Sequence, residues 1–279
     1  MKKIDNIISY IKKTGHNPYS DEKLCKGDIF YINTLYNHYE TLSDELYSVI
    51  KNNNINSLLE LGSYMAVGSH RAQEAGISNI TCSDMWELAD DSSYKKWLKE
   101  KDINYQHFDL TKEPKNEFLN KYDCIIFQET LEHIPYNPAR VLINVNKMLK
   151  DNGILIFSVP NFYSVRSIIN LMKFSHPYVK KEELLDLDSP TEKSGIHWIE
   201  FNSKLIKNII EFCNFNIVSY KGNNIKYGSS IKYKIKNLIK FIIPPLFDQH
   251  RFVLKKDKCF ETYLKNRKKI TSEHEALNL

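Results

Sequence analysis

The sequence has few cysteines and no long apolar run. Its five cysteines are widely spaced and include no C-x-x-C pair, which argues against both the disulfide framework of a small secreted domain and a zinc knuckle. No window reaches the ~18 apolar residues of a membrane span. No apolar stretch of ~7–15 residues follows Met1-Lys2-Lys3, so we expect no export signal and a reducing, cytoplasmic location.

Two glycine-rich signatures of phosphate binding are also absent. A G-x-G-x-x-G pattern counted from Gly62 fails, because position 64 is tyrosine and position 67 is valine. No G-x-x-x-x-G-K-[ST] sequence occurs either. These absences disfavour a nicotinamide dehydrogenase and P-loop phosphoryl transfer.

The charge has no dominant sign. Lys and Arg number 39 against 34 Asp and Glu, which gives a net charge of +5 spread along 279 residues. This balance permits a nucleic-acid partner but does not demand one, and we do not expect one. With 42% hydrophobic and 26% charged residues, the chain is predicted to be globular, with one large domain or two small ones.

The pattern of apolar residues changes near Ser57. Ile4, Ile7, Ile8 and Ile11 recur at helical spacing, so a helical cap is predicted over residues 1–54. Five short apolar runs then alternate with helical segments, which is typical of a parallel sheet. The runs are 58–61, 80–82, 105–108, 124–127 and 154–159, and the helical segments are 69–75, 92–101 and 138–149, the last stopped by Asp151-Asn152-Gly153.

The second half continues this pattern after an interruption. Residues 161–194 are polar and predicted to be irregular, and 161–200 is interpreted as an insertion that shapes an acceptor site. The chain then predicts a helix over 203–212 and strands over 215–220 and 251–254. The main domain is placed at 55–257 and a charged tail at 258–279. The Lys-rich amphipathic segment 231–247 is expected to pack on its own sheet, with peripheral membrane contact as the alternative.

The strongest local feature is the strand 58–61 running into Gly62-Ser63-Tyr64 and then a helix. Glycine lets the chain turn sharply or lets backbone N–H groups face a ligand, and the helix adds its positive end. Ordinary strand-to-helix turns use glycine too. The loop alone therefore does not decide between a ligand site and a plain turn.

Acidic residues fall at the ends of three predicted strands. They are Glu60, Asp84 and Asp109, and Asp84 follows Glu60 by 24 positions. This offset is close to the ~20 residues at which a carboxylate accepts ribose hydroxyls in doubly wound folds. Each aspartate alone is equally consistent with a helix N-cap. The set of three favours one shared crevice.

Two longer segments carry a family resemblance. Residues 122–135 read YDCIIFQETLEHIP, and residues 149–161 read LKDNGILIFSVPN. Together they resemble S-adenosylmethionine-dependent methyltransferases of the Rossmann-like class, in the branch with ubiquinone-pathway O-methyltransferases and small-molecule and sugar methyltransferases. The resemblance covers about 57–254, including an H-x-x-E-F element at 197–201. It implies an α/β fold with a seven-stranded, mostly parallel sheet and helices on both faces.

The resemblance also implies the cofactor, S-adenosyl-L-methionine, and residues to bind it. The implied cofactor-binding residues lie at strand ends and are Glu60, Gly62, Ser63, Tyr64, Asp84, Met85, Asp109, Leu110, Gln128 and Glu129. One departure concerns Tyr64 and Ala66, which occupy positions where the family commonly has glycine. Either the loop bulges to reach Gly68, or the tyrosine ring closes over the methionine part of the cofactor.

His133 and His197 are the candidate acid–base residues. Imidazole with a pKa near 6.5 can accept a hydroxyl proton at neutral pH. The alternative for His133 is a packing or capping role before Pro135. With Glu129 and Glu132, the two histidines resemble a magnesium-binding set of related O-methyltransferases, but the same letters occur in metal-free relatives, and no metal is predicted.

The predicted reaction moves a methyl group to an oxygen, with a nitrogen as second choice, of a small molecule such as a sugar or other glycan precursor. Phe162, Tyr163 and Trp198 are candidates to line the acceptor pocket, unless they belong to the core. Two alternatives stay open. One is an RNA or protein methyltransferase, and the other is a cofactor-binding protein without turnover, motivated by Tyr64. The sequence predicts no oligomeric state.

Overall fold

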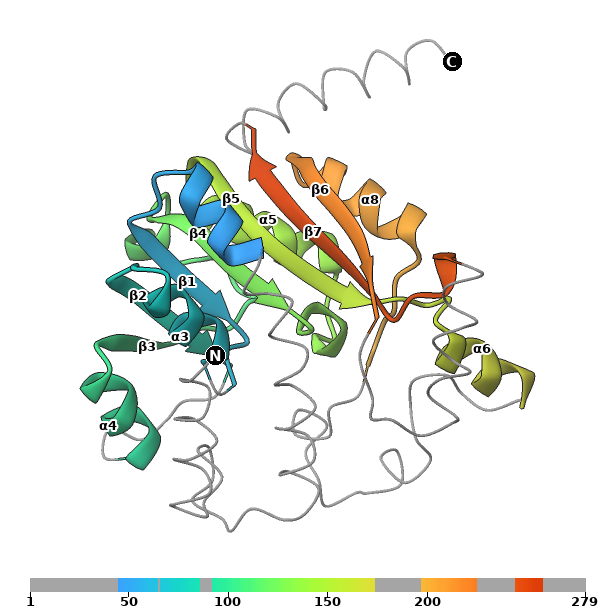
Figure 1. Cartoon of the computed structure of the whole chain (residues 1–279), viewed down its shortest axis with the longest axis horizontal. Helices are drawn as coiled ribbons and strands as arrows, with labels where there is room; N and C mark the ends of the chain where they lie inside the picture. The colour runs from blue at the N-terminus through green and yellow to red at the C-terminus, as the bar shows by residue number, and fades with distance from the viewer. Residues whose placement is uncertain (1–44, 65, 86–91, 174–196, 225–243, 258–279) are drawn as a thin grey trace.

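The computed structural model describes residues 45–64, 66–85, 92–173, 197–224 and 244–257 (Figure 1). Of the predicted N-terminal cap, it describes only a helix over residues 45–52. The tail from 258 and most of the amphipathic segment 231–247 lie outside the described residues. No helix in the described ranges is long and apolar enough to cross a membrane.

Seven strands form one sheet in the order β3-β2-β1-β4-β5-β7-β6. The strands are β1 (Ser57–Leu61), β2 (Asn79–Asp84), β3 (Ile103–His107), β4 (Tyr122–Gln128), β5 (Leu149–Pro160), β6 (Phe215–Asn223) and β7 (Gln249–Lys256). Pairings from β3 across to β5 are parallel, and β7 runs antiparallel to both neighbours, β5 and β6. The predicted seven-stranded, mostly parallel sheet is confirmed.

Helices cover both faces of the sheet (Figure 1). They are α3 (Val67–Glu74), α4 (Ser93–Glu100), α5 (Pro138–Met148), α6 (Val165–Met172) and α8 (Ser203–Phe212), with short 3-10 turns η1 (Asn116–Phe118), η2 (Leu131–His133) and η4 (Pro244–Leu246). Successive strand residues point to opposite faces, so Leu58 and Leu59 enter separate apolar clusters. One cluster packs under α3, α4 and the helix at 45–52, and the other under α5 and α8.

Two predicted elements need correction. Helix α5 ends at Met148, before Asp151-Asn152-Gly153, because Leu149 is already extended and pairs with Tyr122 of β4. The segment 161–194 is not irregular throughout, since it contains α6. The Ser164 hydroxyl caps this helix by accepting a hydrogen bond from the backbone N–H of Ser167 at 3.2 Å, a capping role that the polar composition concealed.

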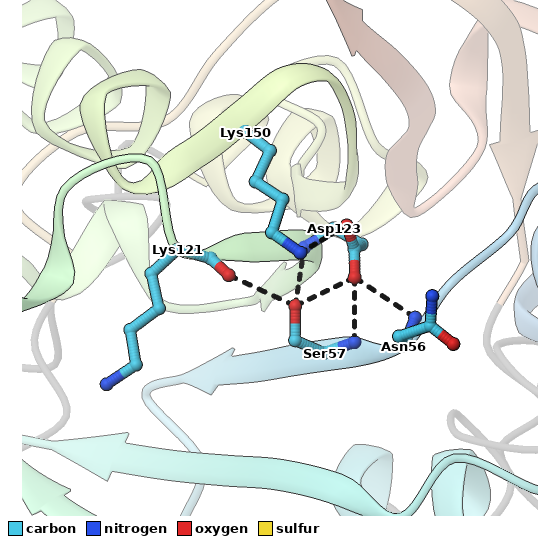
Figure 2. A network of polar contacts seen from close by, with 5 residues as sticks. All are labelled: Asn56, Ser57, Lys121, Asp123 and Lys150. Atoms are coloured by element: carbon cyan, nitrogen blue, oxygen red, sulfur yellow. Dashed lines mark hydrogen bonds and ion pairs between the residues drawn. The ribbon is translucent and has the colours of Figure 1, made fainter.

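A polar network fastens β1 to β4 at their amino ends (Figure 2). One carboxylate oxygen of Asp123 accepts hydrogen bonds from the backbone N–H groups of Asn56 and Ser57 and from the Ser57 hydroxyl. The other accepts one from Lys150 Nζ at 2.8 Å. Burial raises the pKa of Asp123, but hydrogen bonds from Lys150, Ser57 and Asn56 outweigh it and hold the pKa below its ordinary value.

Candidate functional site

The carboxyl ends of the parallel strands lie at one edge of the sheet. Leu61 of β1 pairs with Ser83 of β2 and with Phe127 of β4. Asp84 at the end of β2 pairs with His107 at the end of β3. The register therefore brings the predicted residues to this edge: Glu60, Gly62, Ser63, Tyr64, Asp84, Met85, Asp109, Leu110, Gln128 and Glu129.

Glu60 anchors the loop that follows β1. Its carboxylate accepts hydrogen bonds from the backbone N–H of Gly68 at 2.9 Å and from the N–H and hydroxyl of Ser69, each at 2.7 Å. A Cβ on Gly68 would lie 2.7 Å from a carboxylate oxygen, so this approach requires glycine. Burial raises the pKa of Glu60 to about 7, although the bonds from Ser69 and Gly68 lower it. Glu60 thus has a positioning role, and direct cofactor contact stays a prediction.

Tyr64 and Ala66 keep the backbone shape that glycine would supply. Their φ angles are 43° and 52°, in the left-handed region that non-glycine residues seldom adopt. Gly68 lies inside α3 and so does not replace them in the turn. Tyr64 packs against the buried cluster under α3 and α4, and its carbonyl accepts a hydrogen bond from the Tyr94 hydroxyl at 2.7 Å. The turn is therefore held by tertiary contacts.

Gly62 is the one loop position where both conformation and space demand glycine. Its φ is +61°, and a Cβ there would fall on the side chain of Thr130 after β4. The loop after β1 and the segment after β4 are thus in close contact. The Thr130 side chain therefore fills the space that a side chain at Gly62 would need.

The two predicted adenosine carboxylates end adjacent strands. Asp84 accepts hydrogen bonds from the backbone N–H of Tyr64 at 3.0 Å and of Met85 at 2.8 Å, so it also braces the loop. Asp109 accepts two from Thr111 and pairs with Lys112 at 3.2 Å. Burial raises the pKa of Asp109, but these contacts outweigh it and lower the pKa. Both carboxyls thus hold the loops that follow their strands, and their contact with a cofactor stays a prediction.

Gln128, at the end of β4, is the buried residue that most clearly fits a ligand. Its side chain is 6% exposed, and neither its amide oxygen nor its amide nitrogen has a partner among the described residues. Buried polar atoms without partners are costly, and each calls for an explanation such as a bound group. A polar cofactor lying across the ends of β1 and β4 would satisfy both atoms.

His133 and His197, 64 residues apart in the chain, meet beside this edge. The backbone N–H of Trp198 donates to the carbonyl of Glu132 at 2.7 Å, which ties the segment 197–201 to η2. The two imidazole rings lie edge to face with centroids 4.6 Å apart, and both are partly exposed. Nδ1 of His197 lies 2.8 Å from Oε1 of Glu200, which orients its ring.

Three carboxyls gather behind the histidines. Burial raises the pKa of Glu129 to about 7, although hydrogen bonds with Ser158 and Gln249 and the charge of Arg251 act to lower it. Burial also raises the pKa of Glu132, and the neighbouring Glu129 and Glu200 raise it further. Oε2 of Glu132 has no partner among the described residues. Glu129 has a φ of 47°, so backbone strain is stored at the residue where β4 meets the site.

Glu132, His133 and His197 could together hold a metal ion. Each offers one ligand atom, and these atoms lie within 4.8 Å of one another. Carboxylate and imidazole ligands suit a divalent cation. The fourth residue of the resemblance, Glu129, is not part of this group and instead accepts a hydrogen bond from Ser158 at 2.8 Å.

Several residues around the site were missed by sequence reasoning. Glu200 stands in the H-x-x-E-F element but carried no assigned role, and its spacing from His197 was the available signal. Gln249 and Arg251 reach Glu129 only because β7 returns antiparallel beside β5. No local pattern in residues 249–256 announces that pairing.

The sheet order and the strand-end site define the class of protein as a Rossmann-like methyltransferase. A family model described as a methyltransferase domain matches residues 40–220, so the chain belongs to this methyltransferase family. The predicted class, an S-adenosylmethionine-dependent methyltransferase domain, is thereby confirmed. The particular branch with ubiquinone-pathway enzymes stays a prediction.

Individual proteins are similar at lower levels. An uncharacterised protein of Methanocaldococcus jannaschii is 29% identical over 132 residues, which cover 45% of this chain and about half (51%) of that relative. The trans-methyltransferase CalH, solved in complex with S-adenosylhomocysteine, is 15% identical with a TM-score of 0.56, covering 84% of this chain and 60% of CalH. The 1,6-didemethyltoxoflavin-N1-methyltransferase of Burkholderia thailandensis is 10% identical with a TM-score of 0.53, covering 92% and 90%. At these identities the structures support the fold alone.

Proposed function

We propose that the protein transfers the methyl group of S-adenosylmethionine to an oxygen of a small-molecule acceptor, with a sugar or glycan precursor as the substrate class. The observation that carries the proposal is the His133–His197 pair beside the strand ends, with ring centroids 4.6 Å apart. A base of this kind is needed chiefly for hydroxyl acceptors. Nitrogen acceptors such as free amines need it less.

The described residues divide the work of binding. In this proposal Asp84 accepts hydrogen bonds from the ribose hydroxyls and Asp109 from the adenine amino group, which the position of Asp84 at the end of β2 supports. Gln128 offers a buried donor and a buried acceptor at the end of β4. When bound, the cofactor supplies an electrophilic methyl group on a sulfonium. Holding donor and acceptor in line can supply ~7–11 kcal/mol of the barrier by orientation alone.

His197 is the proposed general base of the pair, because Glu200 orients its ring. Glu200 contacts Nδ1 and orients the ring, and in this proposal Nε2 receives the acceptor proton. Glu200 then stabilises the imidazolium that results, because its carboxylate lies 2.8 Å away. General base catalysis of this kind contributes ~10²–10⁴ in rate. His133 lies against the ring of His197 and helps to fix its orientation.

Exposed aromatic side chains support a small-molecule acceptor. Trp198 directly follows His197 and is 49% exposed, and Tyr163 is 48% exposed. The backbone N–H of Phe162 donates to the carbonyl of Phe201, which brings the segments around Tyr163 and Trp198 together. Such rings present an apolar face and a polar edge to a ligand. The Burkholderia thailandensis neighbour was solved with its small-molecule substrate bound, which is in keeping with this acceptor class.

Calorimetry with S-adenosylmethionine and Asp84→Ala tests the cofactor part. We expect the variant to bind about 10- to 100-fold more weakly, since hydrogen bonds to a charged group are lost. Asp123→Asn, at the opposite sheet edge, is the matched control and should bind like wild type. No heat with wild type, or equal affinity in Asp84→Ala, would contradict the proposal.

Screening metabolite extracts with cofactor labelled in its methyl group tests the acceptor part. Label should enter a hydroxyl-bearing small molecule, and His197→Asn should lower kcat more than it raises KM. Label in RNA or protein, with binding that weakens steeply with salt, would favour the first alternative. Cofactor binding with no label transfer to any pool would favour a protein without turnover.

A further inference from the structure

A buried histidine in β7 contacts the segment that carries His197. His250 is 1% exposed, and its Nε2 lies 3.0 Å from the carbonyl oxygen of Phe201. Its Nδ1 lies 3.0 Å from the hydroxyl of Tyr220 in β6. The methyl transfer proposed above uses neither His250 nor Tyr220. Burying a polar ring is costly unless its nitrogens are hydrogen-bonded, and here both are.

These two contacts fix the tautomer of His250. A carbonyl oxygen can only accept, so Nε2 carries the proton and donates a hydrogen bond to Phe201. Nδ1 then accepts a hydrogen bond from the Tyr220 hydroxyl. Burial lowers the pKa of His250 to about 4, although the bond to Phe201 raises it, so the ring is neutral at pH 7. A buried polar group with all its hydrogen bonds made holds rigidly the segments that it joins.

The carbonyl of Phe201 lies where the two ends of the predicted insertion 161–200 meet. It also accepts a hydrogen bond from the backbone N–H of Phe162 at 3.0 Å. Asn161 and Phe201 form an isolated parallel bridge. We call Asn161, Phe162 and Phe201 the insertion junction. His250 therefore connects the last strand of the sheet to this junction.

The segment before β7 holds the other side of the insertion junction. The side-chain nitrogen of Asn161 donates to the carbonyls of Pro245 at 2.9 Å and Phe247 at 2.8 Å. The backbone N–H of Asn161 donates to the carbonyl of Asp248 at 2.9 Å. Both ends of the insertion are thus fastened to one stretch of chain, residues 245–250.

The segment that carries His197 has two anchors. The backbone N–H of Trp198 donates to the carbonyl of Glu132 at 2.7 Å, and the carbonyl of Phe201 accepts from His250 at 3.0 Å. Loss of the second anchor would leave the segment free to turn about the first. A misplacement of ~1 Å at a reacting group can cost ~10²-fold in rate.

We propose that His250 is a positioning residue for the acceptor side of the reaction, because it sets the place of His197 through the carbonyl of Phe201. The assignment rests on the proposed function, which takes His197 as the general base. Cofactor affinity should not depend on His250. In the sheet order, β1, β4 and β5 separate β7 from β2, which ends in the proposed ribose-binding Asp84.

The test compares His250→Leu with His250→Gln. Leucine makes neither hydrogen bond, whereas glutamine can bring an amide N–H to the position of Nε2. We expect His250→Leu to slow label transfer from methyl-labelled S-adenosylmethionine to a metabolite extract about 100-fold, and His250→Gln to restore most of the rate. Calorimetry should give both variants the wild-type affinity for S-adenosylmethionine.

Nuclear magnetic resonance supplies a readout that does not need turnover. The imidazole signals of His197, assigned with His197→Asn, should shift in His250→Leu and return toward their wild-type positions in His250→Gln. Tyr220→Phe releases the tautomer of His250 and should slow transfer about 2- to 10-fold, as for one lost hydrogen bond. It must show this loss if His250→Leu does not fold.

Val253→Ala is the matched control, because it removes packing from the same strand at a residue whose side chain joins the cluster under α3 and α4. Urea denaturation measures the stability of each variant. Val253→Ala should be destabilised and should transfer label at the wild-type rate.

Three results would overturn the assignment: wild-type transfer by His250→Leu, losses of rate that follow stability equally in His250→Leu and Val253→Ala, or a weakened affinity for S-adenosylmethionine in His250→Leu. Unmoved His197 signals in His250→Leu would overturn it as well. Wild type that transfers no label, with His197 signals that move in His250→Leu, would defeat the proposed function and still support the positioning of His197 by His250.

Discussion

The carboxyls at the two edges of the sheet, Asp123 at one and Glu129 and Glu132 at the other, have pKa values shifted in opposite directions. At the amino edge, both carboxylate oxygens of Asp123 accept hydrogen bonds, including one from Lys150, and its pKa is lowered (Figure 2). At the carboxyl edge, Glu129 and Glu132 have raised pKa values, and one oxygen of Glu132 has no partner in the described ranges. The Asp123 carboxylate is satisfied without a ligand, and the Glu132 carboxylate is not. Stability and function are thus separated along the strands.

Removing Asp123 should cost the most stability, because its carboxylate joins β1 to β4 at the amino edge. Asp123→Ala leaves the backbone N–H groups of Asn56 and Ser57 short of an acceptor, while the Ser57 hydroxyl keeps the carbonyl of Lys121. We expect a loss of about 2–4 kcal/mol in the free energy of unfolding, measured by urea denaturation. Cofactor affinity of the folded variant should match wild type. A loss of affinity similar to that of Asp84→Ala would show that the edges are not independent.

The carboxyls at the two edges should make the free energy of unfolding depend on pH in opposite directions. Because the pKa of Glu129 is raised in the folded protein, its protonated carboxyl contributes to folding stability. This contribution is full below about pH 4.5 and is lost as pH rises toward about 7. The free energy of unfolding of Glu129→Gln should therefore increase relative to that of wild type, by on the order of 2 kcal/mol, as pH rises from 4.5 to 8.

The matched control for that experiment is Asp123→Asn. The lowered pKa of Asp123 gives a contribution that is present above the ordinary value of 3.8 and is lost as pH falls below it. The difference in the free energy of unfolding between Asp123→Asn and wild type should therefore become smaller only at pH values below this range. Parallel pH profiles for the two variants would contradict the assignment of opposite shifts.

The smallest effect is expected from the lysine that completes the amino edge. Lys150→Met removes an ion pair whose lysine side chain is 44% exposed, and it leaves the three donors from Asn56 and Ser57 in place. Exposed ion pairs contribute about 0.2–1 kcal/mol, so the loss should stay within that range in urea denaturation. A loss equal to that of Asp123→Ala would mean that the ion pair with Lys150, and not the hydrogen bonds to Asn56 and Ser57, supplies most of the stability that Asp123 contributes.

Much of the sheet was predictable, because each strand has its own apolar run. The runs at 58–61, 80–82, 105–108, 124–127 and 154–159 fall in five of the seven strands, or extend one residue past the end, as at Phe108. The helix α6 was not predictable from its polar surroundings, since its start depends on the Ser164 cap. The end of α5 was misplaced because pairing of Leu149 with β4 outweighs the local turn residues.

The candidate site also contains residues that the sequence predicted and residues that it did not. His133 and His197 were chosen from residue type and motif, and the contact between Trp198 and Glu132 brings them together. The contributions of Arg251 and Gln249 depend on an antiparallel strand that returns from the far end of the sequence, which no local spacing encodes. Long-range pairing is thus what sequence reasoning could not supply.

The left-handed turn at Tyr64 and Ala66 has a consequence for the timing of ligand capture. Glycine at these positions would have many accessible backbone conformations, whereas residues with a Cβ have far fewer to lose when a ligand binds. The turn is therefore set before a ligand arrives, and association requires little rearrangement there. The backbone strain at Tyr64 and Ala66 lowers the stability of the folded protein. In exchange, the loop loses less conformational entropy when a ligand binds than a flexible glycine loop would.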